Sequence, residues 1–251
     1  MGINFLSMQK IISYPISVIY YLCFGFCLAV FHPIQWVCYK LFGYNAHKKS
    51  VDVLNFFLTY SALLLFNVPR LKNRFELPKG RPIIFVSNHQ STFDIPGLIF
   101  FFRKYQGKFI SKIELAKSKI PSIAFNLKVG GGANIDRKDS EQSIGEIKKL
   151  AKRMKKYKWS AFIFPEGTRA KDGKMKAFQV GGISTIATIC PEALIVPVAI
   201  KGSLEMAKKG FFPLLPFHKM TWEVLSPIEI KGRDIQDVVK EAEDSIRKVV
   251  E

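Results

Sequence analysis

No formally charged side chain lies between Lys10 and Lys40. The core of this stretch, residues 11–31, is almost wholly apolar, and about 20 such residues are enough to cross the hydrocarbon core of a bilayer. A helix that is apolar on all sides has to be buried, and a chain of 251 residues is too small to wrap it. We therefore expect a membrane-associated helix here, with 11–31 as a possible span.

A second apolar run covers residues 51–66 and begins beside Asp52. It is short for a span and suits an interfacial or re-entrant helix. We assign 1–68 to this membrane element, either as one span followed by a surface helix or as a helix pair dipped into one leaflet. A buried two-helix subdomain of a soluble protein is the remaining alternative. The basic linker between the runs favours a catalytic domain that faces the cytoplasm, and a cleaved signal peptide fits poorly.

The balance of charge indicates an anionic partner. Lys and Arg number 38 against 20 Asp and Glu, a formal charge of +18, which suits nucleic acid, phospholipid headgroups or phosphorylated metabolites. The apolar N-terminus favours lipid, so we expect a membrane partner and no nucleic acid. The cysteines show no metal-ligand spacing, so we expect reduced thiols and no metal site.

From about residue 69 the pattern changes to short apolar runs that alternate with polar helical segments. Such alternation is typical of a single layered α/β domain with a mostly parallel central sheet flanked by helices, which we assign to 69–251. The expected strands are 83–87, 108–111, 133–136, 160–164, 194–200 and 221–229. The expected helices are 95–104, 120–128, 140–157, 177–190 and 235–250. Asp234 is the expected N-cap of the last helix.

A histidine and an aspartate follow the first of these strands, within residues 88–94. Functional residues of parallel α/β sheets gather at the carboxyl ends of strands. A neutral imidazole takes a proton from an alcohol near neutral pH if an aspartate holds it in the right tautomer. We interpret His89 as such a base and Asp94 as its partner; Asp94 has an alternative role as a helix N-cap. Ser87 and Ser91 raise the alternative of a serine nucleophile, but no Gly-x-Ser-x-Gly elbow is present.

The segment after strand 160–164 reads Glu166-Gly167-Thr168-Arg169. A glycine lets the backbone approach a ligand, and an arginine grips phosphate through two hydrogen bonds. The carboxylate of Glu166 would repel a phosphate, so we expect it to orient a basic or hydroxyl group instead. The alternative is an ordinary turn with a solvated arginine.

Two further basic residues lie between these segments. Lys112 follows strand 108–111, and three consecutive glycines precede strand 133–136, which would deliver Arg137. Both would reach the same edge of the sheet as candidate phosphate ligands. The basic run 148–158 has two interpretations, a solvated helix face or a surface that rests on anionic lipid.

These motifs together resemble the glycerolipid acyltransferase family typified by 1-acyl-glycerol-3-phosphate acyltransferases. The resemblance covers about residues 80–205, and its His-x4-Asp block is met by His89 and Asp94. The other blocks are met by Lys112–Leu115 with Pro121 and Ile135–Arg137, by Phe164–Arg169, and by Val196–Val198 leading to Gly202.

The resemblance implies an O-acyltransferase without an acyl-enzyme or bound cofactor. His89, oriented by Asp94, would deprotonate the hydroxyl of lysophosphatidic acid, which would attack acyl-CoA or acyl-carrier protein to give phosphatidic acid in phospholipid biosynthesis. The implied substrate-binding residues are Lys112, Arg137, Glu166, Gly167, Thr168 and Arg169. Another lysophospholipid or glycerol 3-phosphate is the alternative acceptor. A basic surface-binding module, with steeply salt-dependent binding, is the alternative from a different class.

Overall fold

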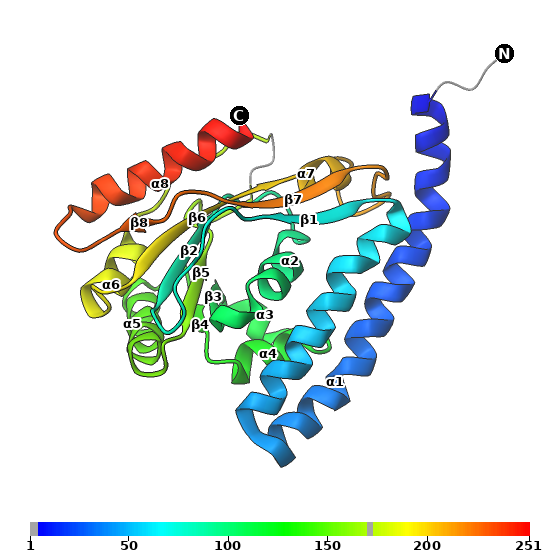
Figure 1. Cartoon of the computed structure of the whole chain (residues 1–251). Coiled ribbons are helices and arrows are strands. Elements are labelled where there is room, and N and C mark those ends of the chain that lie inside the picture. The colour runs from blue at the N-terminus through cyan, green and yellow to red at the C-terminus, as the bar shows by residue number, and fades with distance from the viewer. Residues whose placement is uncertain (1–4, 170–172) are drawn as a thin grey trace.

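The computed structural model describes residues 5–169 and 173–251. One eight-stranded sheet forms the centre, in the order β1-β7-β6-β2-β5-β3-β4, with β8 also paired to β6 (Figure 1). Strand β6 pairs antiparallel with β7 and β8, and the other pairings are parallel. The mostly parallel α/β sheet expected from the sequence is confirmed. The strands are β1 Val68–Lys72, β2 Ile83–Ser87, β3 Gly107–Lys112, β4 Ala133–Ile135, β5 Ser160–Ile163, β6 Leu194–Lys201, β7 Lys219–Val224 and β8 Ile228–Glu229.

The strand prediction was wrong at two places. The expected strand 221–229 is two strands, because the chain leaves the sheet between Val224 and Ile228 at a segment that contains Pro227, and proline has no N–H to donate. Strand β1 was missed because its Val-Pro-Arg-Leu-Lys sequence shows no run of apolar residues. It lies at the edge of the sheet, where a proline such as Pro69 is tolerated.

The helices of the body agree with the sequence where a cap marks them. Both α5 and α8 begin and end as predicted, and the carboxylates of Asp139 and Asp234 accept backbone N–H bonds from their first turns. Helix α4 begins three residues later than expected, after Pro121, and α6 begins at Gly181. The body helices are α2 Asp94–Phe101, α3 Ile113–Lys117, α4 Ile123–Val129, α5 Ser140–Tyr157, α6 Gly181–Ile189, α7 Ser203–Met206 and α8 Ile235–Val250.

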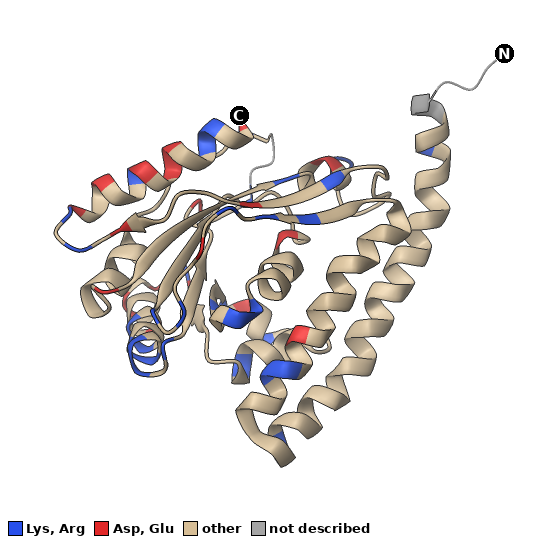
Figure 2. Ribbon diagram, viewed as in Figure 1, with Lys and Arg blue, Asp and Glu red and all other residues tan. Residues whose placement is uncertain are grey.

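Apolar side chains cover both faces of the sheet. On one face α5, α6 and α8 pack through the buried residues Leu150, Met154, Ile183, Val239 and Ile246. On the other face the buried residues are Phe85, Phe102, Phe162 and Trp222 of the body, with Tyr20 from the N-terminal helix. Figure 2 shows Lys and Arg gathered along α5. Helix α5 packs on the face of the sheet opposite the N-terminal helix, but just beyond its C-terminal end the Trp159 ring stacks on Tyr44 of that helix, with centroids 5.0 Å apart.

The N-terminal helix α1, Phe5–Tyr60, is broken at Gly43, whose φ is 76° and ψ is −169°. Residues other than glycine rarely adopt such a positive φ. The chain reverses there, so residues 5–42 and 44–60 form a hairpin of two helices side by side (Figure 1). Leu28 on the first arm packs with Leu54 and Leu58 on the second. The hairpin then continues through a 3₁₀ turn, Ser61–Leu65, into β1.

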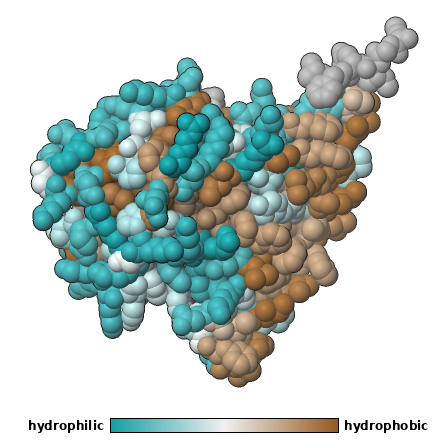
Figure 3. All heavy atoms as spheres, in the orientation of Figure 1, coloured by the Kyte–Doolittle hydropathy of each residue, from teal (hydrophilic) through white to brown (hydrophobic). Residues whose placement is uncertain are grey.

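The outer surface of this hairpin is apolar (Figure 3). Leu22, Phe26, Leu41 and Phe42 are each about 70% exposed, and large exposed apolar patches mark membrane or protein interaction sites. Residues 8–65 are long and apolar enough to cross a membrane by length and composition. The long apolar helix indicates membrane association. Its two-armed form favours the helix pair over a span followed by a separate surface helix.

Candidate active site

The four polar segments singled out in the sequence follow four adjacent strands. His89 follows β2, Glu166 follows β5, Lys112 ends β3 and Arg137 follows β4, and these strands are consecutive neighbours in the sheet. Their pairings are parallel, so the carboxyl ends lie at one edge. At about 4.8 Å between strands the whole row spans roughly 15 Å.

The histidine and the aspartate are in direct contact. The Nδ1 atom of His89 lies 2.9 Å from Oδ2 of Asp94, whose side chain is fully buried. The same oxygen accepts the backbone N–H groups of Gln90 at 2.7 Å and Ser91 at 2.9 Å. Asp94 is not the N-cap of α2, since Phe93 holds that position and the aspartate turns back onto the preceding loop.

This contact decides the tautomer of His89. Because a carboxylate oxygen only accepts hydrogen bonds, Nδ1 carries the proton and Nε2 is left with a free lone pair. The imidazole lies flat on the ring of Phe164, with centroids 4.0 Å apart and planes 13° apart. Its side chain is 16% exposed. The ring is therefore held in one orientation, with its basic nitrogen available to a ligand.

The other oxygen of Asp94 has a partner that sequence reasoning missed. Ser203 Oγ, fully buried at the start of α7, donates a short hydrogen bond to Asp94 Oδ1. Trp222 Nε1 donates to the backbone carbonyl of Asp94 at 3.1 Å. The Trp222 indole fits only because Gly97 lacks a side chain, since a Cβ there would lie 2.2 Å from the ring. No motif marks Ser203, because its relation to Asp94 exists only in the folded chain.

Glu166 connects two loops through their backbones. Its Oε1 accepts the N–H of His89 at 2.7 Å, and its Oε2 accepts the N–H of Lys176 at 2.9 Å. Burial raises the pKa of this carboxyl, and the two backbone donors oppose that effect. With both oxygens occupied, Glu166 fixes the backbone beside the His89 imidazole.

Gly167, Thr168 and Arg169 form a turn beside the histidine. Gly167 has a φ of 72°, with nothing within 4 Å of the place where a Cβ would lie, and its backbone N–H donates to the carbonyl of Phe164 at 3.1 Å. Arg169 Nη1 donates to Thr92 Oγ1 at 3.0 Å. Thr168 Oγ1 accepts from Lys176 Nζ at 2.6 Å. Lys176 is thus a further cation of this turn, which the sequence motifs did not indicate.

Lys112 and Arg137 complete the row, and neither side chain is bonded to His89. Both are exposed, and within the described residues neither side chain forms a hydrogen bond or a salt bridge. Burial lowers the pKa of the Arg137 guanidinium, and the nearby charge of Glu114 opposes this. Two of the three glycines before β4 are sterically required, because a Cβ at Gly130 or Gly132 would lie within 2.6 Å of a backbone oxygen.

The serine alternative is not supported. Ser91 Oγ accepts the N–H of Phe93 at 3.2 Å, and the buried Ser87 Oγ has no hydrogen-bond partner in the described part of the chain. Neither hydroxyl is bonded to His89. Among the described residues no group of three His, Cys, Asp or Glu side chains is placed to hold a metal ion.

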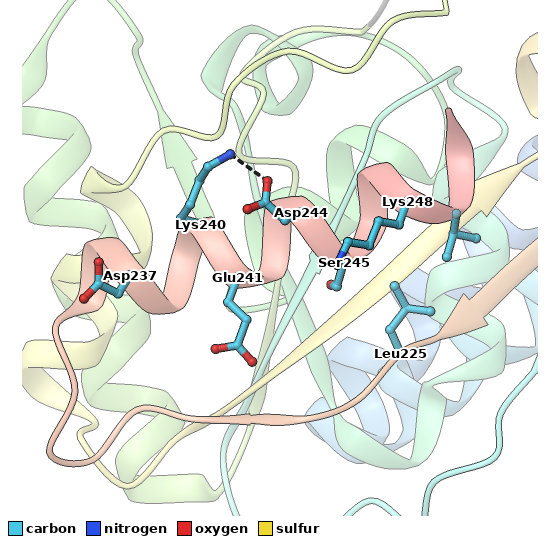
Figure 4. Close-up of a pocket in the computed structure, with 8 residues that line it drawn as sticks. Leu225, Asp237, Lys240, Glu241, Asp244, Ser245 and Lys248 are labelled. Carbon is cyan, nitrogen blue, oxygen red and sulfur yellow. Dashed lines mark hydrogen bonds and ion pairs between the residues drawn. The ribbon is translucent and has the colours of Figure 1, made fainter.

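An open groove beside α8 lies apart from this row (Figure 4). Its residues are Leu225 and, from α8, Asp237, Lys240, Glu241, Asp244, Ser245, Lys248 and Val249. Lys240 is bonded to Asp244 on the same helix. The groove shares no residue with the His89 row.

Comparison with known proteins decides the family. The family model described as Acyltransferase matches residues 68–201, which carry the whole row of site segments. The chain belongs to this family. The chain is similar to chloroplastic 1-acyl-sn-glycerol-3-phosphate acyltransferases of plants. The Arabidopsis thaliana enzyme is 30% identical over 67% of this chain and 45% of its own length. The Brassica napus enzyme is 35% identical over 51% of this chain and 36% of its own length. The chain thus spans less than half the length of each.

A solved structure has the same fold as this acyltransferase-family chain. The crystal structure of the 1-acyl-sn-glycerophosphate acyltransferase PlsC from Thermotoga maritima aligns with a TM-score of 0.78, covers 96% of each chain and is 24% identical. The likeness covers the N-terminal hairpin as well as the sheet, and at this identity it establishes the fold alone.

Proposed function

We propose that this protein is a 1-acyl-sn-glycerol-3-phosphate O-acyltransferase, which transfers an acyl group from acyl-CoA or acyl-carrier protein to lysophosphatidic acid. The observation that carries the proposal is the buried Asp94 carboxylate on His89 Nδ1, directly beside the turn of Arg169. A base for a hydroxyl and a grip for a phosphate are the two requirements of this acceptor. The relatives named as acyltransferases of this acceptor support the same reaction.

The chemistry follows from the tautomer of His89. Nε2 takes the proton of the acceptor hydroxyl as the oxygen attacks the thioester carbonyl. The new C–O bond forms, the C–S bond breaks, and the leaving thiolate takes the proton back from the imidazolium. Asp94 stabilises the transient positive charge of His89 across 2.9 Å. The base itself remains uncharged before and after the transfer.

The acceptor phosphate would be held by the turn and the row. Arg169, Thr168 and Gly167, which leaves room for the ligand because it lacks a side chain, form one side. Lys112 and Arg137 form the other, as cations of the neighbouring strands. In this assignment Glu166 acts on the substrate only through the loops that its two oxygens hold.

The membrane element has a role in this reaction. Residues 1–68 would hold the catalytic domain, residues 69–251, at a bilayer surface through the exposed apolar side of the hairpin (Figure 3). Lysophosphatidic acid and phosphatidic acid would then enter and leave within the lipid. A domain that faces the cytoplasm agrees with the exposed basic residues on either side of the break at Gly43, Lys40 and Lys49.

An acceptor panel tests the proposal. Membranes that carry the protein are given labelled acyl-CoA or labelled acyl-carrier protein with lysophosphatidic acid, with a lysophospholipid that bears a larger headgroup, or with glycerol 3-phosphate. We expect transfer to lysophosphatidic acid to be the most efficient. Efficient transfer to another acceptor in preference would replace the proposed substrate, and release of free fatty acid without any acceptor would show a hydrolase.

A further inference from the structure

A short loop of the catalytic body also presents apolar side chains beside the hairpin. Residues 207–217 connect α7 to β7 and read Ala-Lys-Lys-Gly-Phe-Phe-Pro-Leu-Leu-Pro-Phe. Phe211 is 64% exposed and Phe212 is 48% exposed, and Lys208 and Lys209 before them are exposed as well. In Figure 1 this segment lies next to the N-terminal half of α1. The sequence motifs gave no reason to associate it with the membrane.

The loop is fixed to the hairpin by hydrogen bonds. Tyr21 OH donates to the carbonyl of Phe211, and Gln9 Nε2 donates to the carbonyl of Pro216 at 2.9 Å. Ser17 Oγ donates to the carbonyl of Leu214 at 3.2 Å and accepts its N–H at 2.9 Å. Leu214 is fully buried beneath, whereas Phe211 and Phe212 stay at the surface, with the Phe212 ring 5.7 Å from the ring of Tyr14 on the hairpin.

We infer that residues 208–212 are a second membrane-contacting element, which places Phe211 and Phe212 in the interfacial region of an anionic bilayer with Lys208 and Lys209 on the headgroups. The inference rests on the proposed function, because it assumes an acceptor that resides in the bilayer. Paired exposed aromatic rings that adjoin an apolar surface are a membrane-interface pattern. The two lysines have no acidic partner within the described residues, which suits anionic lipid rather than an apolar protein partner.

The loop is also connected to the reacting groups. The guanidinium of Arg169 lies 5.9 Å from the centre of the Phe211 ring. Helix α7, directly before the loop, begins with Ser203, which donates to Asp94. Contact of the loop with lipid would therefore hold the phosphate-binding turn at the height of the headgroups, which the hairpin alone does not ensure.

The test compares acceptors in two physical states with the full-length protein. The variants are Phe212→Ser and Lys208→Glu/Lys209→Glu, and the matched control is Lys148→Glu/Lys152→Glu on the opposite face of the sheet. The acceptor is lysophosphatidic acid in vesicles of equal parts phosphatidylcholine and phosphatidylglycerol, or a short-chain form kept monomeric in water. Loss of a phenylalanine contact or reversal of two interfacial charges should raise KM for the vesicle acceptor on the order of tenfold. KM for the monomeric acceptor should stay unchanged, and the control should match wild type in both.

A direct measurement of insertion accompanies the kinetics. In Phe212→Trp, the additional tryptophan fluorescence over wild type should shift to shorter wavelength with these vesicles and be quenched by brominated acyl chains. An unshifted, unquenched tryptophan, or loop variants with wild-type KM for the vesicle acceptor, would overturn the inference. Transfer to neither acceptor by wild type would instead refute the proposed function.

Discussion

Replacement of Asp94 by asparagine removes one charge from a buried contact and leaves its shape in place. The amide oxygen has a defined position in this variant, because the N–H groups of Gln90 and Ser91 both point at the site of Oδ2. The amide nitrogen then faces Ser203, whose hydroxyl oxygen also accepts hydrogen bonds. His89 therefore keeps its proton on Nδ1, and Nε2 remains the base.

The expected loss of activity comes from charge alone. With about 4 Å between the centres of the imidazolium and carboxylate charges and an effective dielectric constant near 20, their attraction is about 4 kcal/mol. Its loss from the transition state slows transfer by roughly a thousandfold, since each 1.4 kcal/mol is tenfold. In a serine protease, an aspartate-to-asparagine change that also reverses the histidine tautomer lowers kcat about ten-thousandfold. The structure predicts the smaller loss.

The assay is kcat for labelled acyl transfer by four proteins: wild type, Asp94→Asn, His89→Ala and the double variant. Because Asp94 acts through His89, its replacement should have almost no effect once the histidine is absent. A loss below tenfold in Asp94→Asn would show that the carboxylate does not stabilise the histidine in the reaction. A further large loss in the double variant would show that Asp94 acts on something other than His89.

Three further substitutions test other parts of the structure. Ser203→Ala leaves a buried oxygen of Asp94 without a hydrogen-bond donor, at a cost of about 1–3 kcal/mol. We therefore expect kcat to fall about tenfold or more, with KM for the acceptor unchanged. A raised KM alone would contradict the role of Ser203 in positioning Asp94. Arg169→Lys keeps the positive charge but loses the paired hydrogen bonds that the proposed phosphate contact requires. KM for the acceptor should therefore rise about tenfold or more, with little change in kcat. An unchanged KM would show that Arg169 does not bind the phosphate. Burial and the charge of Lys48 lower the pKa of Lys108 to about 7, with an opposing effect of Asp52. Between about pH 7 and pH 10 the Lys108 side chain is therefore protonated in the unfolded chain and neutral in the folded one, so stability rises with pH across this range. Lys108→Met has no proton to bind at this position, so it should raise Tm at neutral pH and make Tm less dependent on pH. An unchanged or lower Tm would contradict burial as the cause of the lowered pKa.

The sequence predicted the row of site segments because two regular patterns met there. Apolar runs marked β2 and β5 well, and parallel strands bring their carboxyl ends to one edge. The contact of His89 with Asp94 followed from a short separation along the chain, which a single turn closes. Contacts of this kind depend on local geometry, so sequence spacing is informative about them.

The contacts that the sequence did not predict join distant segments. Ser203 and Asp94 are separated by 109 residues, and only the order of β2 and β6 in the sheet brings them together. The loop 207–217 carries no motif that marks its position, and its place beside the hairpin depends on hydrogen bonds to Tyr21 and Ser17. The hairpin itself depends on a single positive φ at Gly43, and the apolar pattern on either side fits a span equally well.

The central claim is that His89 is the base for acyl transfer to a phosphate-bearing acceptor at a membrane. It is tested most directly by labelled acyl transfer from acyl-CoA or acyl-carrier protein to lysophosphatidic acid, with wild type and His89→Ala in parallel in the same membranes. The account predicts labelled phosphatidic acid from wild type and a loss of at least a hundredfold in His89→Ala, the lower end of what a positioned base contributes. Equal formation of phosphatidic acid by the two proteins would contradict it.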